Sequence, residues 1–264
     1  MKGAIDISWG SIVLGYFILI IPLLLFKYYK LNLIKDSIIS VIRMTLQLYL
    51  LGFYLEYIFK LDNIFVNITW IIIMILISVS TTIKKSKVSF KYYFVPLLSS
   101  LTFVVFLTLL YFIGMTLGMK YFLNTRYLIP IVGILLGNSI QSNIIALNSF
   151  NSKLKSEYNL YQYAIANGAS KYDALLPFMK HALTQALSPM IAMIAVVGLI
   201  SIPGMMTGQI LGGSSPFLAI KYQIVTMVAI FFAKSLVIVL TLNFTNKFIF
   251  DELGNIRDTK KSKA

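Results

Sequence analysis

The sequence contains no cysteine and a single histidine, His181. The lack of cysteine excludes disulfide bonds, zinc–thiolate sites, iron–sulfur clusters and cysteine nucleophiles. One histidine leaves no histidine metal cluster and no Ser-His-Asp arrangement of the usual kind. Acidic residues are also few, with 9 Asp and Glu against 23 Lys and Arg, which argues against a proton relay of paired carboxylates. We therefore expect no catalytic residue in this chain, and its metal ligands are unknown.

Charged residues of both signs are scarce as well. They make up 12% of the chain, whereas 58% is hydrophobic and the mean hydropathy is +0.84. A soluble domain averages about a quarter charged residues, so this composition is typical of a membrane protein. The net charge of +14 has a matching explanation, because lysines gather in cytoplasmic loops and face anionic lipid. We expect the lipid bilayer, and not nucleic acid, as the partner of this charge.

Seven apolar runs approach or exceed the roughly 20 residues that a helix needs to cross a bilayer. They predict an all-α, polytopic protein with about seven transmembrane helices, in a single transmembrane domain over residues 1–264. A polar, disordered cytoplasmic tail is expected over residues 248–264. The predicted spans are Ser8–Phe26, Ile38–Phe59, Ile64–Val79, Tyr93–Gly114, Leu128–Phe150, Ala182–Ile200 and Leu218–Leu242.

The distribution of lysine and arginine predicts the orientation. With seven crossings, alternate connections lie on the same side of the membrane. The connections around Lys30, Lys87 and Lys155, together with the C-terminal tail, hold most of the positive charge. The positive-inside rule places this set in the cytoplasm. The N-terminus is then outside, the C-terminus is cytoplasmic, and the protein is a multi-pass protein of the cell membrane.

The largest predicted cytoplasmic loop, residues 151–181, has the pattern of two helices joined by a corner. Gly168 suits the left-handed turn that closes a helix over Glu157–Asn167. Ser170 and Asp173 resemble a capping box that begins a second helix, which runs back into the membrane at Ala182. Pro177 is expected to kink or interrupt this second helix.

This loop has two interpretations. It is either an amphipathic segment at the lipid interface or a docking element for a cytoplasmic partner. Permeases of ABC transporters dock their ATPase through an EAA-type pattern of small residues, a glycine and a later apolar–proline pair, which Leu176 and Pro177 supply here. The candidate docking residues are Ala164, Ala166, Gly168, Ala169, Ser170 and Asp173. The chain has no GxxxxGK[ST] phosphate loop, so ATP and Mg would be bound by the partner subunit and no cofactor by this chain.

Polar side chains inside the predicted spans are candidates for a translocation pathway, because such residues are costly in a membrane. Arg43 and Gln47 lie four residues apart and share one helix face. Arg43 either lines a path or reaches the interface with its long side chain, whereas Gln47 is deeper and should face protein or a cavity. Lys234, inside the last span, needs a partner.

The fifth span contains GILLGNSIQSN, residues 133–143. Gly133 and Gly137 form a GxxxG pair that permits close helix packing. Asn138 and Gln141 lie three residues apart on one face. They form either interhelical hydrogen bonds or part of a polar pathway.

The segment SIPGMMTGQILGG, residues 201–213, is too apolar for a solvated loop and too rich in glycine for a helix interior. Irregular backbone at membrane depth is tolerated only when it is buried in protein or lines a cavity. We expect this segment to be re-entrant or tightly packed at the outer mouth, as a gate or as a close-packed helical hairpin. The candidate pathway residues are Arg43, Gln47, Asn138, Gln141, Met205, Met206, Gln209 and Gln223.

The phrase VGLISIPGMMTGQILGG followed by AIKYQ resembles the FetB (YbbM) family of membrane proteins. DSIISVIRMTLQL, IPIVGILLGNS and NGASKYDA match the same family in order along the chain, and the resemblance covers roughly residues 35–243. The departure is Tyr163, where an acidic residue is expected before the Gly-Ala pair.

The resemblance implies the permease subunit of an ABC exporter, acting as a homodimer with two ATPase subunits and linked to iron export and oxidative-stress tolerance. Plant relatives are associated with aluminium tolerance. The residues themselves offer no set of ligands for a bare hard cation, so a chelated metal, or transient contact with amides and methionines, fits them better. Two alternatives remain open at this point: a secondary carrier or channel without an ATPase, and a membrane scaffold or sensor.

Overall fold

The computed structural model describes residues 5–119, 122–251 and 257 of the chain. These residues form helices and no strand, and an isolated bridge joins Val197 and Ser201. The all-α prediction is therefore confirmed. The helices are α1 (Trp9–Tyr16), η1 (Phe17–Leu19), α2 (Ile20–Tyr28), α3 (Ile34–Leu61), α4 (Ile64–Ser86), α5 (Phe90–Leu109), η2 (Leu110–Gly118), α6 (Thr125–Ser156), α7 (Tyr158–Ala166), α8 (Lys171–Val196), α9 (Gly204–Leu211) and α10 (Pro216–Phe248).

Within these ranges, six helical segments are long and apolar enough to cross a membrane: Trp9–Tyr28, Ile34–Leu61, Ile64–Ser86, Phe90–Thr116, Thr125–Ser156 and Pro216–Phe248. Each contains or overlaps one of the predicted spans. Several extend past the predicted ends, because polar residues can continue a helix beyond the hydrocarbon. Lys84 and Lys85, for example, lie in the last turn of α4, where positive charge complements the helix dipole.

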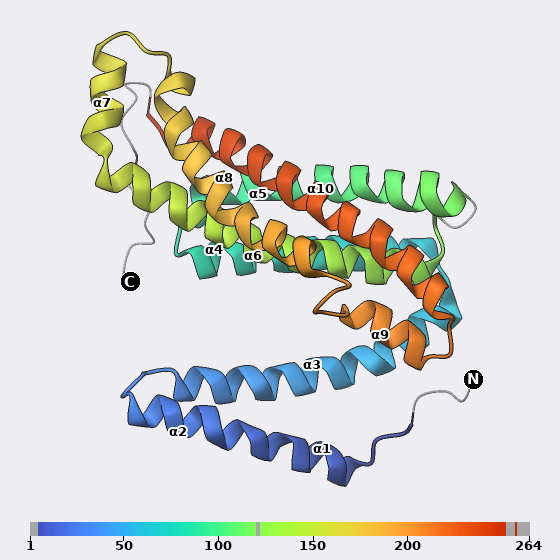
Figure 1. The fold of residues 1–264 in the computed structure, drawn as a ribbon. Helices are drawn as coiled ribbons and strands as arrows, with labels where there is room; N and C mark the ends of the chain where they lie inside the picture. Colours follow the sequence, from blue (N-terminus) through green and yellow to red (C-terminus); the bar gives the residue numbers. More distant parts are fainter. Residues whose placement is uncertain (1–4, 120–121, 252–256, 258–264) are drawn as a thin grey trace.

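The sixth predicted span, Ala182–Ile200, differs from the others. It belongs to α8, which starts at Lys171 and ends at Val196, where the backbone becomes extended. This helix is 26 residues long, but it carries Lys180, His181 and Gln185 and is not among the six apolar segments. Pro177 does not interrupt α8, so that part of the expectation was wrong. The helix reaches from the corner after α7 into the bundle without a break (Figure 1).

The core lies among α4, α5, α6, α8 and α10, which pack against one another. Its fully buried side chains include Val79, Leu97, Leu147 and Val237. The α1–α2 segment and α3 form a separate hairpin beside this bundle (Figure 1). Ile58 is the one buried residue that the structure describes in this hairpin. The many exposed apolar side chains of this hairpin suit contact with lipid.

The helices alternate in direction along the bundle, so α1 begins and α10 ends at opposite ends (Figure 1). We call one end the basic end: there α4 meets α5 at Lys87, and α6 meets α7. At the other end α3 meets α4 at Asp62, and α9 joins α8 to α10. Most of the predicted tail, residues 248–264, lies outside the described residues.

Candidate functional site

The corner between α7 and α8 is built as the sequence predicts. Gly168 has a φ of +86°, which glycine adopts without strain. Its N–H donates to the Ile165 carbonyl at 3.0 Å, and the N–H of Ala169 donates to the Ala164 carbonyl at 3.0 Å. These two bonds form the Schellman motif that ends a helix. They fix the direction in which the chain leaves α7.

The start of α8 is capped immediately after this turn. The backbone N–H of Asp173 donates to Ser170 Oγ at 3.2 Å, and the Ser170 hydroxyl donates to the Asp173 carboxylate at 2.5 Å. All six candidate docking residues thus lie in one short segment. Gly168, Ser170 and Asp173 are exposed there, as is Tyr163, at 69%.

The corner is attached to the bundle through aromatic contacts. Tyr161 is buried, and its ring lies 5.4 Å from that of Phe250, just after α10. The Lys171 ammonium lies 4.3 Å from the centre of the Phe250 ring. Burial raises the pKa of the Tyr161 phenol. The corner therefore extends beyond the bundle (Figure 1) yet is held on one side by the C-terminal end of α10.

At the opposite end, α9 covers a cavity of about 390 Å³ that we call the α9 pocket. Met205 and Gln209 line it from α9, and Arg126 and Tyr222 line it from α6 and α10. The Thr226 hydroxyl lies 3.7 Å from Met205 Sδ. At 1.5 Å per residue, Thr226 is about 15 Å along α10 from Pro216. The segment after α8 therefore folds back along α10, as a re-entrant segment does.

Two side-chain amides in this region have oxygens without a partner. Gln209 Oε1 and Gln223 Oε1 are buried, and neither has a hydrogen bond to any residue that the structure describes. Gln223 lies three residues before Thr226, on the same face of α10. Met205 and Gln209 thus line one cavity, and Gln223 lies one turn before Thr226, which contacts Met205. Met206 is on the same short helix but does not line the cavity.

The other candidate pathway residues lie elsewhere. Arg43 and Gln47 are exposed on α3, and Gln47 lines a separate cavity of about 420 Å³ with Tyr54 and Trp70. Asn138 donates to the carbonyl of Ile134 in its own helix at 2.9 Å, while Gln141 is exposed. The eight residues therefore occupy three places in one copy of the chain.

The expected close packing at glycine is visible at one of the two GxxxG positions. A Cβ on Gly133 would lie 3.5 Å from Met74 Cε, an ordinary contact with α4. Nothing in the described part of the chain lies within 4 Å of the corresponding point on Gly137, Gly204 or Gly208. In a single copy of the chain, no other described helix packs against these three glycines.

A row of polar side chains that was not expected from the sequence lies along α4 and α6. The two helices run parallel: Asn67 donates to Thr125 Oγ1 at 2.8 Å near one end, and Met74 meets Gly133 further along. This register places the second half of α4 opposite the middle of α6. The buried polar residues there, which we call the polar seam, are Ser78, Thr82, Ser86, Ser139, Ser142 and Asn143.

Several groups in the polar seam are unsatisfied. Asn143 is 0% exposed, and neither its amide nitrogen nor its oxygen has a hydrogen-bond partner among the described residues. The same holds for Ser78 Oγ and Ser86 Oγ. Leaving a buried polar group unpaired costs about 1–3 kcal/mol, so such groups call for a water, an ion or a function. In the sequence, the spacing of Ser78, Thr82 and Ser86 by four places these three residues on one face of α4, but it does not show which residues of α6 they meet.

Lys234 is buried in α10, at 7% exposure. Its ammonium lies 3.9 Å from Met190 Sδ on α8, and it forms no ion pair with a described carboxylate. The described residues also contain no group of three or more His, Asp or Glu side chains that could hold a metal ion.

Comparison with known proteins places this architecture in a family. The family model "Uncharacterised protein family (UPF0014)" matches residues 9–250. The chain belongs to the UPF0014 family. No solved structure matches it.

Three UPF0014 relatives cover most of the chain. It is 36% identical over 203 residues to "Protein ALUMINUM SENSITIVE 3" of Arabidopsis thaliana, covering 75% of this chain and 71% of the relative. It is 29% identical to "UPF0014 membrane protein YjkA" of Bacillus subtilis, covering 81% and 84%. It is 27% identical to "Probable iron export permease protein FetB" of Escherichia coli, covering 98% of each chain. This UPF0014 protein is a multi-pass membrane protein, and the expected FetB-type resemblance is confirmed.

Proposed function

We propose that the chain is the permease subunit of an ATP-driven exporter of iron or a related metal in the cell membrane. A separate cytoplasmic ATPase would dock on the corner at residues 164–173. The name of the Escherichia coli relative supports metal export. The observation that supports coupling between the ATPase and the transmembrane helices is the structure of the corner, where a Schellman turn leads directly into the capped start of α8.

The geometry suits transmission of force. Helix α7 is short and exposed on one side, whereas α8 is long and packs against α6 and α10. A push on α7 would reach α8 through the turn at Gly168. In this turn the carbonyls of Ala164 and Ile165 accept hydrogen bonds, and Gly168 has a positive φ that glycine adopts readily. Helix α8 would then move against the two helices that line the α9 pocket. Closure of two ATPase subunits on a permease homodimer would supply this push.

The cargo is best handled as a metal complex. The chain has no cysteine and one histidine, so it offers mainly amides, hydroxyls and thioethers along the α9 pocket and the polar seam. Such neutral groups can contact a chelated metal without stripping its ligands. Bare hard cations prefer carboxylates and other oxygen donors, and the lysines near these surfaces would repel them.

Reconstitution with candidate ATPases tests the proposal. The purified permease should co-purify with an ABC ATPase, and iron should stimulate ATP hydrolysis by the complex in liposomes. Because the chain lacks cysteine, Tyr163→Cys provides a single reporter at the corner. A membrane-impermeant maleimide should label it only in inside-out vesicles. Labelling from outside the cell, or a permease that binds no ATPase, contradicts the proposal.

A further inference from the structure

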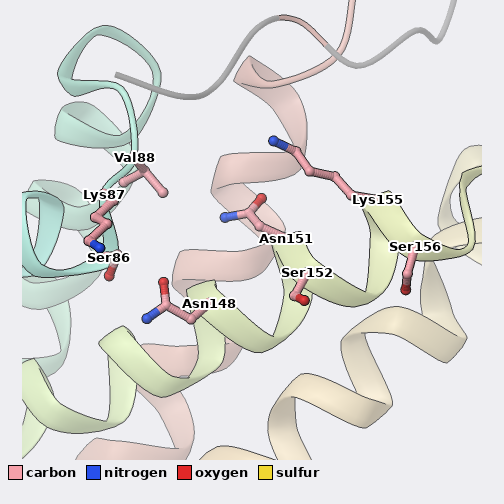
Figure 2. Close-up of a pocket in the computed structure, with 8 residues that line it drawn as sticks. All are labelled: Ser86, Lys87, Val88, Asn148, Asn151, Ser152, Lys155 and Ser156. Atoms are coloured by element: carbon pink, nitrogen blue, oxygen red, sulfur yellow. The ribbon is translucent and has the colours of Figure 1, made fainter. Parts of the chain in front are cut away.

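A polar cavity of about 520 Å³ lies at the basic end, between the α4–α5 turn and the last turns of α6. Figure 2 shows its lining, which we call the basic pocket: Ser86, Lys87, Val88, Asn148, Asn151, Ser152, Lys155 and Ser156. None of the candidate docking residues and none of the eight candidate pathway residues belongs to it; Ser86 is shared with the polar seam.

The described residues of the basic pocket carry positive charge. Lys87 and Lys155 contribute two ammonium groups, and no carboxylate is among the described residues that line the cavity. Neither lysine forms an ion pair with any residue in the described ranges. Lys153, on the same helix as Lys155, differs because it is paired with Glu157. The two free lysines therefore leave a local excess of positive charge.

The floor of the pocket adds hydrogen-bond donors that are already desolvated. The Tyr93 hydroxyl donates to Asn151 Oδ1 at 3.0 Å. This bond fixes the orientation of the Asn151 amide, so that its nitrogen can donate to a ligand. Asn151 Nδ2 and Ser86 Oγ are both buried without a partner among the residues described, and Ser86 is only 6% exposed. In Figure 2 the nitrogens of Asn151 and Lys155 extend toward the turn that carries Lys87. The arrangement offers donors and positive charge together.

A site with ammonium groups and spare N–H and O–H donors fits an anion with several acceptor oxygens. Lysine is a common phosphate ligand, and basic pockets between transmembrane helices bind phospholipid headgroups. The cavity lies at the helix ends, where headgroups lie, and Phe90 beside it is exposed. We propose that the basic pocket binds a phosphate group, carried either by an anionic phospholipid or by free phosphate.

Thermal unfolding of the delipidated full-length protein in detergent tests this inference. The probes are short-chain phosphatidylglycerol and inorganic phosphate, each compared with sodium chloride at equal ionic strength, and short-chain phosphatidylcholine as an uncharged lipid. Phosphatidylglycerol or inorganic phosphate should raise the Tm in a saturable manner. A response to the lipid alone identifies a headgroup site, and a response to both identifies a site for phosphate itself.

The double variant Lys87→Gln/Lys155→Gln should weaken the apparent affinity by about fivefold for each lysine, the equivalent of the ~1 kcal/mol per basic residue near a membrane. Lys84→Gln/Lys85→Gln, which changes two exposed lysines outside the cavity, is the matched control and should bind as the wild type does. Lys155→Gln alone serves if the double variant does not fold. The inference is overturned if neither phosphate probe raises the Tm, if phosphatidylcholine or chloride acts equally, or if the pocket variants respond like the control.

Discussion

Ser170 and Asp173 hold each other at the first turn of α8. The serine hydroxyl donates to the aspartate carboxylate at 2.5 Å, and the aspartate N–H donates to the serine oxygen at 3.2 Å. Two residues earlier, Gly168 closes α7 with a φ of +86°. The geometry of the whole corner therefore depends on Gly168, Ser170 and Asp173, whose contributions can be measured separately.

Replacing Ser170 with alanine should loosen this corner without unfolding the protein. Loss of an N-cap costs about 1 kcal/mol, which corresponds to a Tm about 2–4 °C lower. Because the first turn of α8 frays, metal-stimulated ATP hydrolysis by the reconstituted complex should fall by more than the small loss of stability would explain. The matched control is Ser89→Ala at the N-cap of α5, where the side chain makes no capping hydrogen bond. Equal losses in both variants would contradict the role of the cap.

Alanine at Gly168 should have the opposite effect to alanine at Gly137. An L-residue in the left-handed region costs about 1–2 kcal/mol, so Gly168→Ala should lower the Tm and the coupled ATPase activity. Gly137 lies inside α6 with open space around its Cβ position, so Gly137→Ala gains up to about 1 kcal/mol of helix propensity. Thermal unfolding of the two variants side by side gives the sign of each change. A shared sign would mean that backbone conformation does not decide the result.

Asn143→Leu should separate stability from transport. The substitution removes two buried polar atoms that have no partner among the described residues and keeps the branched shape of the side chain, so the Tm should stay the same or rise. If the polar seam takes part in transport, iron retained in stressed cells should increase. Asn243→Leu is the control, because Asn243 donates to its own helix at the Val239 carbonyl, at 2.8 Å. Lower stability with normal transport would assign Asn143 a purely structural role.

Local features of the fold could be predicted from the sequence, whereas features that depend on contacts between distant helices could not. The corner could be predicted because capping uses residues within five positions of one another, as Gly168, Ser170 and Asp173 do. Six spans could be predicted because length and hydropathy decide them. The extent of α8 was less evident, since its polar first half looks like a loop although the helix continues through Pro177.

The polar seam could not be predicted from the sequence, because its members come from α4 and α6 and meet only in a particular register. Asn138 illustrates the difficulty: it shares a helix with Asn143, yet it bonds to its own backbone while both polar atoms of Asn143 are buried without a partner among the described residues. Gln47 and Gln209 likewise look equivalent as isolated amides in apolar segments. Only the fold shows that Gln209 lines the α9 pocket, whereas Gln47 lies on the separate hairpin.

Lys234→Met should stabilise the protein. The lysine is buried against Met190 with no carboxylate partner in the described part of the chain, and an uncompensated buried charge is costly. Methionine retains most of the aliphatic volume without the charge. We expect a higher Tm for Lys234→Met and little change for Lys247→Met, which replaces an exposed lysine in the last turn of the same helix. A lower Tm for Lys234→Met would show that the ammonium is satisfied in the membrane.

Asp62 provides a pH-dependent prediction at the end of the bundle opposite the corner. Its carboxylate accepts hydrogen bonds from the hydroxyl and the backbone N–H of Thr125. These bonds lower the pKa of Asp62 below its usual value of 3.8. A depressed pKa in the folded state means that the ionised form stabilises the fold. This contribution is complete above the unfolded pKa and is lost as the pH falls through the folded pKa.

Asp62→Asn isolates that contribution, because asparagine tolerates the left-handed backbone at this position, where φ is 37°. The wild type should have the higher Tm above about pH 4, and the difference should shrink as the pH is lowered below the usual carboxyl pKa. Thr125→Val should remove the same pH dependence and also leave the buried amide of Asn67 without its acceptor, for an additional loss of about 1–3 kcal/mol. Thermal unfolding between about pH 3 and pH 6 measures both effects. A difference between wild type and Asp62→Asn that stays constant over this range would mean that the carboxylate does not titrate as the Thr125 contacts require.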